Sequence, residues 1–106
     1  MDAATLFALL EDVKVFLGVT WSDNFTDNRL TMLIEAGAAY LDKKNGEAAD
    51  YTVSGLPRSL LFEYVRYARD GALDVFENNY RSMILAMGHE RMVNQNAAQS
   101  TAQAEG

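Results

Sequence analysis

Apolar residues recur with a helical period along most of the chain, and the longest such stretch runs from Pro57 to about Glu77. Spacings of three and four residues between apolar positions are typical of an amphipathic helix. Pro57 suits the first turn of a helix, where a backbone N–H has no partner to lose. The stretch would be about 30 Å long, which predicts a long central helix. Its apolar stripe comprises Leu61, Tyr64, Val65, Ala68, Ala72, Val75 and Phe76.

A helix is also predicted at the start of the chain, from Leu6 to Leu17. The residues that fall on its one apolar face are Leu6, Leu9, Leu10, Val13, Phe16 and Leu17. Either Asp2 or Thr5 can act as its N-cap, since both side chains can accept a bond from a free backbone N–H. Gly18 suits the left-handed residue that follows many helices, with Val19 positioned to cover the last turn. The pattern therefore predicts a helix with a defined end.

A second helix is predicted to begin at Thr26 or Asp27, either of which can cap it, and to run to about Lys44. Asn45-Gly46 is a stop signal. The segment from Gly46 to Gly55 is the sizeable loop of the chain. It contains three residues of strand propensity, but no second convincing strand could pair with them, so a loop is expected.

Small residues occur in the middle of both longer helices. A glycine inside a helix costs about 1 kcal/mol relative to alanine, so it needs a structural reason. We expect the backbones of the second and third helices to cross closely at these positions. The residues predicted at this crossing are Gly37, Ala38, Gly71 and Ala72.

A bend is predicted at Asn78-Asn79, because asparagine competes for local hydrogen bonds and tolerates the left-handed conformation. A last helix should follow from Tyr80 to Met87 or beyond. From Asn94 the chain is rich in Asn, Gln, Ala, Ser and Thr without an apolar stripe, and such a segment cannot bury enough apolar surface to order itself. The predicted fold is all-α: a small antiparallel bundle of about four helices over residues 1–93, with a long central third helix, and a flexible tail at 94–106.

Composition narrows the possible functions. A chain without cysteine holds no disulfide or thiolate metal site, and its single histidine excludes multi-histidine sites. The net charge of −6 disfavours a general nucleic-acid binder, which needs clustered Lys and Arg. There is neither a membrane-length apolar run nor a secretory signal pattern. We therefore expect a soluble protein made inside the cell.

The sequence also lacks the constellations that catalysis requires. The serines at 54, 59 and 82 have no nucleophile-elbow sequence around them, and His89 has no plausible relay partner. No glycine-rich phosphate loop follows a strand. The expectation is a structural or binding protein that is not an enzyme and uses no cofactor and no metal.

The order of short segments along the chain carries more information than any one of them. The first half contains Asp12-Val13-Lys14, Phe16-Leu17-Gly18-Val19, Leu30-x-x-Leu33-Ile34, Tyr40-Leu41 and Asn45-Gly46. The second half contains Pro57, Leu60-Leu61, Tyr64-Val65-Arg66, Ala72-Leu73 and Phe76-Glu77-Asn78-Asn79-Tyr80. In this order the segments resemble the head–tail connector (head-completion adaptor) family of tailed bacteriophages, over about Leu9 to Met92.

Members of that family are small helical bundles without enzymatic activity, so the resemblance implies a structural protein of the virion. It implies copies assembled as a ring, a dodecamer in the virion, beneath the portal protein. The ring would extend the DNA channel toward the stopper or tail-completion protein. DNA would pass through an acidic channel without specific binding. The protein would be made in the cytoplasm of the bacterial host, would act at the head–tail interface and would contact no membrane.

The resemblance also suggests which residues bind partners, because the C-terminal part of such adaptors reaches the portal. The residues predicted at the portal or protomer interface are Met83, Met87, Met92, Asn94, Gln95 and Asn96. Methionine adapts to irregular surfaces, so the three methionines could equally fill gaps in the core. The loop residues predicted to face the lumen or the next protein in the stack are Asp50, Tyr51, Thr52 and Val53.

A different class of function stays open beside this one. A small acidic helical protein can also act as a regulator that blocks a protein partner, either by mimicking DNA or by filling a groove. That function would need its acidic residues gathered on one face, whereas Arg66, Arg69 and Arg81 are interleaved with them in the sequence.

Overall fold

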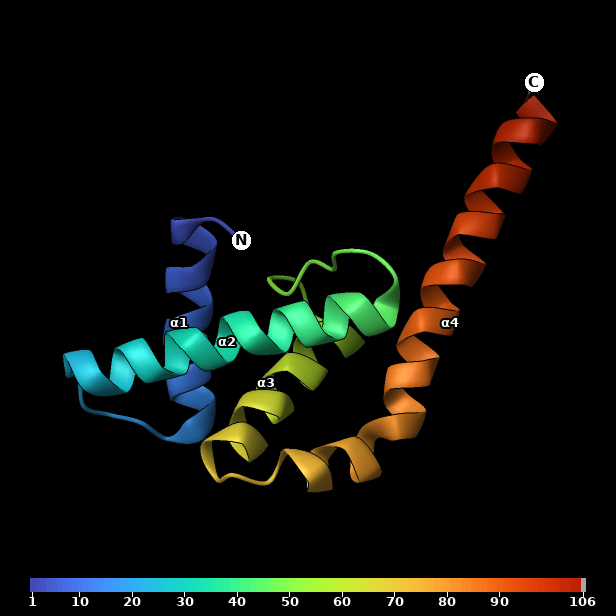
Figure 1. Ribbon diagram of the computed structural model, residues 1–106. Helices are drawn as coiled ribbons and strands as arrows, with labels where there is room; N and C mark the ends of the chain where they lie inside the picture. The colour runs from blue at the N-terminus through green and yellow to red at the C-terminus, as the bar shows by residue number, and fades with distance from the viewer. Residues whose placement is uncertain (106) are drawn as a thin grey trace.

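The computed structural model describes the backbone of residues 1–105 and the side chains of residues 1–94. Within these residues the chain forms four helices and no strand (Figure 1). They are α1 (Ala3–Leu17), α2 (Asn24–Asn45), α3 (Leu56–Arg69) and α4 (Leu73–Glu105). The predicted all-α fold of four helices is confirmed.

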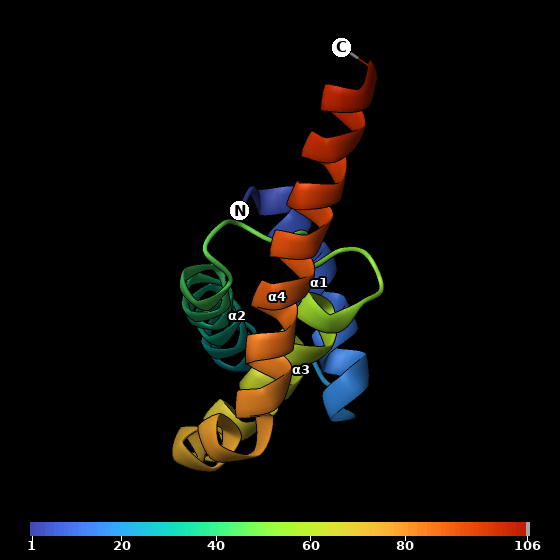
Figure 2. The ribbon, with the colours of Figure 1, turned by 90° about the vertical axis from the view of Figure 1, so that its right-hand side faces the viewer.

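The first three helices and the first half of α4, through Met87, form the bundle. In Figure 1, α1 crosses α2 steeply, α3 runs back beneath α2, and α4 packs against both α2 and α3 before it leaves them. The rest of α4 projects away from the other helices, as Figure 2 also shows. The molecule is accordingly elongated, with principal extents of 55 × 31 × 19 Å.

The core is centred on the fully buried ring of Phe76, which comes from the start of α4. Its ring centroid lies 5.5 Å from that of Tyr64 on α3 and 5.2 Å from that of Tyr80 on α4. Tyr40 on α2 and Tyr67 on α3 complete this aromatic cluster. Three helices therefore meet around one side chain. The fully buried aliphatic residues are Leu9, Val13, Leu30, Ile34, Leu41, Leu60, Leu61 and Val65.

The helix starts are capped by aspartates. Asp2 caps α1, where its Oδ1 accepts a hydrogen bond of 2.7 Å from the backbone N–H of Thr5. The prediction that Thr26 or Asp27 caps α2 is wrong, because Asp23 does so and α2 begins at Asn24. The Asp23 carboxylate accepts bonds from both the backbone N–H and the hydroxyl of Thr26. These bonds hold the pKa values of the Asp2 and Asp23 carboxyls below their ordinary range.

The expected long third helix is wrong in its C-terminal part, because α3 ends at Arg69. Gly71 adopts a left-handed conformation with φ of 70°. The N–H of Gly71 donates to the carbonyl of Ala68, and the N–H of Ala72 donates to the carbonyl of Tyr67. This pair of bonds is a Schellman motif, which satisfies the last carbonyls of a helix and reverses the chain. The first helix ends in the same way at Gly18, with Val19 buried as predicted.

The predicted close crossing is correct for Gly37 and wrong for Gly71. A Cβ atom at Gly37 would lie 2.7 Å from Cδ1 of Tyr64 and 2.8 Å from Cδ1 of Leu61, so α2 and α3 do approach closely there. At Gly71 a Cβ atom would meet nothing within 4 Å. Ala38 is buried beside the crossing, whereas Ala72 belongs to the turn after α3. The crossing partner of Gly37 is therefore the middle of α3.

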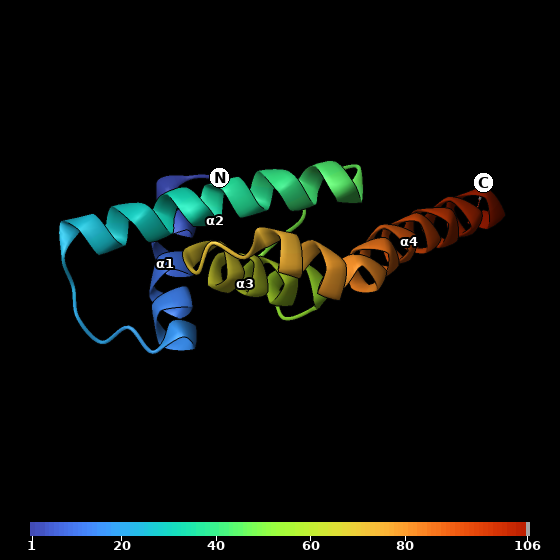
Figure 3. The same cartoon turned by 60° about the horizontal axis from the view of Figure 1, so that its bottom comes forward.

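The prediction that a separate last helix begins at Tyr80 is wrong, because α4 begins at Leu73 and runs through Asn78, Asn79 and Gly88. The helix nevertheless changes direction in its first turns, which lie across the end of the bundle (Figure 1). Figure 3 shows α4 beginning beside α3 and leading away from it. The backbone of α4 is helical to Glu105. The flexible tail was predicted at 94–106, and the side chains of residues 95–106 lie outside the described residues.

An ion pair fixes α1 against the start of α2. The Lys14 ammonium lies 2.9 Å from Oδ1 of Asp27, with side-chain exposures of 8% and 30%, and it also donates to the Ser22 hydroxyl. A charged group this deeply buried is stable only when it is paired. The pair therefore sets how α1 lies on the bundle.

Replacing Gly37 by alanine should lower the free energy of unfolding by about 1–3 kcal/mol, because the new methyl group overlaps Leu61 and Tyr64. Urea denaturation measures the change. Ala36→Ser at an exposed position of α2 is the control and should stay within about 0.5 kcal/mol of the wild type. A Gly37→Ala protein as stable as the wild type would contradict the close crossing.

Asp27→Ala should lower the free energy of unfolding by about 3 kcal/mol, because it leaves the buried Lys14 ammonium without its carboxylate. The double variant Lys14→Met/Asp27→Ala should recover most of this loss, since methionine fills a similar volume without a charge. Equal losses in the single and the double variant, measured by urea denaturation, would show that the pair does not hold α1 in place.

Candidate functional site

The methionines predicted at an interface do not share one environment. Met83 and Met92 are exposed, at 39% and 53%, whereas Met87 is buried in the core between α4 and the bundle. The prediction that Met87 is an interface residue is therefore wrong, and this side chain fills a gap in the core. Asn94 is exposed. The side chains of Gln95 and Asn96 lie outside the described residues.

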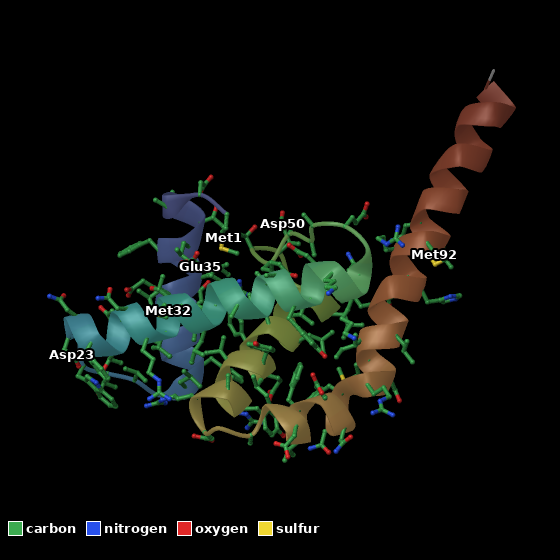
Figure 4. The ribbon with its side chains drawn as sticks, in the orientation of Figure 1. Met1, Asp23, Met32, Glu35, Asp50 and Met92 are labelled. Atoms are coloured by element: carbon green, nitrogen blue, oxygen red, sulfur yellow. The ribbon has the colours of Figure 1, made fainter. Side chains whose placement is uncertain are left out.

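A groove separates the C-terminal half of α2 from α4, and we name it the α2–α4 groove. It consists of two adjoining cavities of about 300 and 350 Å³, which share Lys44, Ile84 and Leu85. The buried Ile84 belongs to its floor, and the exposed Leu85 and Met92 project from α4 beside it. Along the groove, the apolar surface therefore continues from the buried core to the exposed side chains of α4. Figure 4 places Met92 on the part of α4 that leaves the bundle.

The groove is positively charged, although the whole chain carries a net charge of −6. Lys44 on α2 and Arg81 on α4 line it and are exposed, and Glu77 is the one acidic side chain among the described residues of its lining. The Lys44 ammonium lies 5.6 Å from the centroid of the Tyr40 ring, which keeps it over the groove. An apolar groove with a cationic rim fits an apolar helix that carries a carboxylate.

The predicted loop site is only partly available. Asp50, Thr52 and Val53 are exposed, but Tyr51 is buried, so its assignment to the lumen or the next protein is wrong. The Tyr51 hydroxyl donates to Oδ1 of Asp42 at 2.6 Å, and Arg58 donates to the Tyr51 carbonyl at 3.0 Å. The loop is therefore fastened to α2 and α3 through its central residue. Burial, together with the hydrogen bond to Asp42, raises the pKa of the Tyr51 phenol.

A second hollow lies between this loop, α2 and the start of α1, with a volume of about 510 Å³. Four carboxyl groups line it, from Asp2, Glu35, Asp42 and Asp50. Figure 4 shows Met1, Glu35 and Asp50 on this side of the molecule. Asp42 already accepts bonds from Tyr51 and from the backbone of Ala49. Among the described residues no histidine or carboxylate cluster has the geometry to hold a metal ion.

The outward face of α1 was not among the predicted sites. Phe7 and Val15 are 64% and 82% exposed there, while the other face of α1 packs into the core. The signal in the sequence is that α1 has apolar residues on both faces, and a helix of that kind is normally covered on both sides. Periodicity locates the buried stripe but does not report the apolar residues outside it.

Comparison with known proteins adds no relative. No family model, no curated protein and no solved structure matches this chain. Within the described residues no helix combines the length and the hydropathy needed to cross a bilayer.

Stability should fall as the pH rises above about 10, the pKa of an unfolded tyrosine. The raised pKa of Tyr51 means that its contribution is complete below that pH and is lost above it. Tyr51→Phe keeps the buried ring but removes the titrating hydroxyl, so its melting temperature should fall less steeply between pH 9 and 11. Parallel curves for the two proteins would show that Tyr51 ionises as freely as an exposed tyrosine.

Proposed function

We propose that this chain is a head–tail connector of a tailed bacteriophage, which assembles as a ring beneath the portal and extends the DNA channel toward the tail. The observation that carries the proposal is α4. It has 33 residues, about 50 Å of helix, and among the described side chains its buried core residues end at Met87, in the first half of the helix. A helix that leaves its own domain with Met92 and Val93 exposed is suited to docking on another protein.

A ring protomer needs two different lateral surfaces, because each copy contacts one neighbour on either side. The bundle carries exposed apolar residues on α1 and along the α2–α4 groove, which lie on different sides of the molecule (Figure 1). This arrangement supports a head-to-tail contact between copies. A self-complementary contact needs only one such surface.

The acidic charge supports a channel through which DNA passes. A net charge of −6 in every copy makes a ring strongly negative, and such a wall repels phosphate rather than retaining it. The portal protein and the stopper or tail-completion protein are the proposed neighbours above and below. No cofactor and no catalytic residue enters this function.

One observation favours a second function, that of a small acidic regulator which blocks a protein partner. The hollow lined by Asp2, Glu35, Asp42 and Asp50 gathers carboxylates on one side of the fold, although they are scattered in the sequence. Such a surface could receive a basic segment of another protein. This function would give discrete complexes in place of rings.

Deleting residues 94–106 should abolish binding to a candidate portal and leave the bundle folded, because the core residues whose side chains the structure describes all precede this segment. Binding is measured by co-sedimentation with the portal, and folding by circular dichroism and thermal melting. Asp50→Ala/Thr52→Ala in the exposed loop is the matched control and should keep portal binding. A truncated protein that still sediments with the portal would count against docking through α4.

A further inference from the structure

One face of α1 is left uncovered by the residues that the structure describes. Ala4, Phe7, Ala8, Glu11 and Val15 recur at helical spacing and are all exposed. The opposite face supplies Leu9, Leu10 and Val13 to the core. Four of the five outward residues are apolar, with a single carboxylate among them. A helix that is apolar on both faces is suited to burial on both, so this outer face of α1 is built for a partner.

The α2–α4 groove contains a glycine that the fold does not require. Gly88 lies inside α4 without a left-handed backbone, and glycine weakens a helix relative to alanine. A Cβ atom at this position would meet nothing closer than the Lys44 carbonyl oxygen at 3.7 Å, which is an ordinary contact. The bundle alone therefore leaves room for a larger residue. The absence of a side chain at Gly88 keeps the groove open between Leu85 and Met92.

The two surfaces match in length and in charge. Phe7 and Val15 are separated by about 12 Å along α1, and Leu85 and Met92 by about 10 Å along α4. Glu11 lies midway between the two apolar residues of α1. Lys44 and Arg81 line the groove beside Leu85. Apolar residues can thus meet apolar residues while the carboxylate meets a cation.

We infer that the outer face of α1 of one copy occupies the α2–α4 groove of the next copy. The inference rests on the proposed ring and names the surfaces that join its protomers. In Figure 1, α1 lies at one side of the molecule and α4 at the other, so each pairing leaves a free α1 face and a free groove. A contact of this heterologous kind propagates, and it forms a ring where the rotation closes.

Charge reversal tests the pairing in solution. Glu11→Lys and Lys44→Glu should each raise the dissociation constant for self-association about tenfold, because each puts like charges together in the contact. An equimolar mixture of the two variants should regain association, since the reversed α1 meets the reversed groove. Sedimentation velocity over a wide concentration range measures both effects. No recovery on mixing overturns the proposed pair of surfaces.

Matched controls separate the contact from the change in net charge. Lys43→Glu alters the exposed neighbour of Lys44 that does not line the groove, and Glu35→Lys alters an exposed carboxylate on α2. Both should associate like the wild type. If either control is as impaired as its test variant, the effect belongs to overall charge and the pairing is wrong.

Gly88→Leu tests the groove without altering charge. The leucine should fill the groove and abolish association at concentrations where the wild type assembles. Its melting temperature should stay equal or rise, because leucine favours the helix. If Gly88→Leu does not fold, Gly88→Ala takes its place. It adds one methyl group to the groove and should also weaken association. Undiminished association of a folded Gly88→Leu protein contradicts the inference.

Cross-linking shows which surfaces meet and separates this inference from the proposed function. The chain has no cysteine, so Val15→Cys and Leu85→Cys introduce unique reactive sites. With a bifunctional maleimide, a chain carrying both should give a ladder of multimers, and each single variant should stay uncoupled. Dimers of the Val15→Cys variant alone would reveal a self-complementary contact instead. If the protein forms rings on the portal but gives no ladder of cross-linked multimers, the proposed pair of surfaces is wrong and the connector function still holds. If the protein does not self-assemble at all, both the pair of surfaces and the connector function are wrong.

Discussion

The structure depends on the reversal of the chain between α3 and α4. Gly71 supplies the left-handed residue, and the two backbone bonds to Tyr67 and Ala68 close the turn. The reversal returns Phe76 to the bundle, where it is buried completely against aromatic rings from α2 and α3. The same placement makes α4 the second wall of the α2–α4 groove. Without this turn the chain would have a longer third helix and no groove.

At the other side of the molecule the position of α1 is set by the pair between Lys14 and Asp27. It joins the end of α1 to the start of α2 across the connecting turn. Arg58 adds a second link, because it donates to Asp12 on α1 and to the carbonyl of Tyr51 in the loop. These polar contacts hold one face of α1 inward and leave Phe7 and Val15 outward. The two proposed lateral surfaces are thus positioned by different parts of the fold.

The sequence was sufficient for the class of fold, the end of α1 and the close approach at Gly37, because each depends on local pattern. The sequence pattern predicted a third helix that continues through Gly71, because the apolar spacing is unbroken across the turn. Phe76 lies beyond the turn but packs against the same face of α3 as the apolar stripe. Asp70-Gly71 is itself a turn signal that outweighs the stripe. Periodicity likewise could not assign Met87 to the core and Met92 to the surface, since α4 leaves the bundle between them. Tyr51 is buried and contacts Asp42 and Arg58, and no local sequence pattern predicts these contacts.

The central claim is that this helical protomer acts by binding copies of itself on a larger template. Electron microscopy of the full chain, alone and mixed with a candidate portal, tests it most directly. The account predicts closed rings of the protein capping the portal, with α4 directed toward it and dispersed or weakly associated subunits in the portal's absence. Single subunits that stay unassociated with the portal, or discrete one-to-one complexes with another protein, would contradict it.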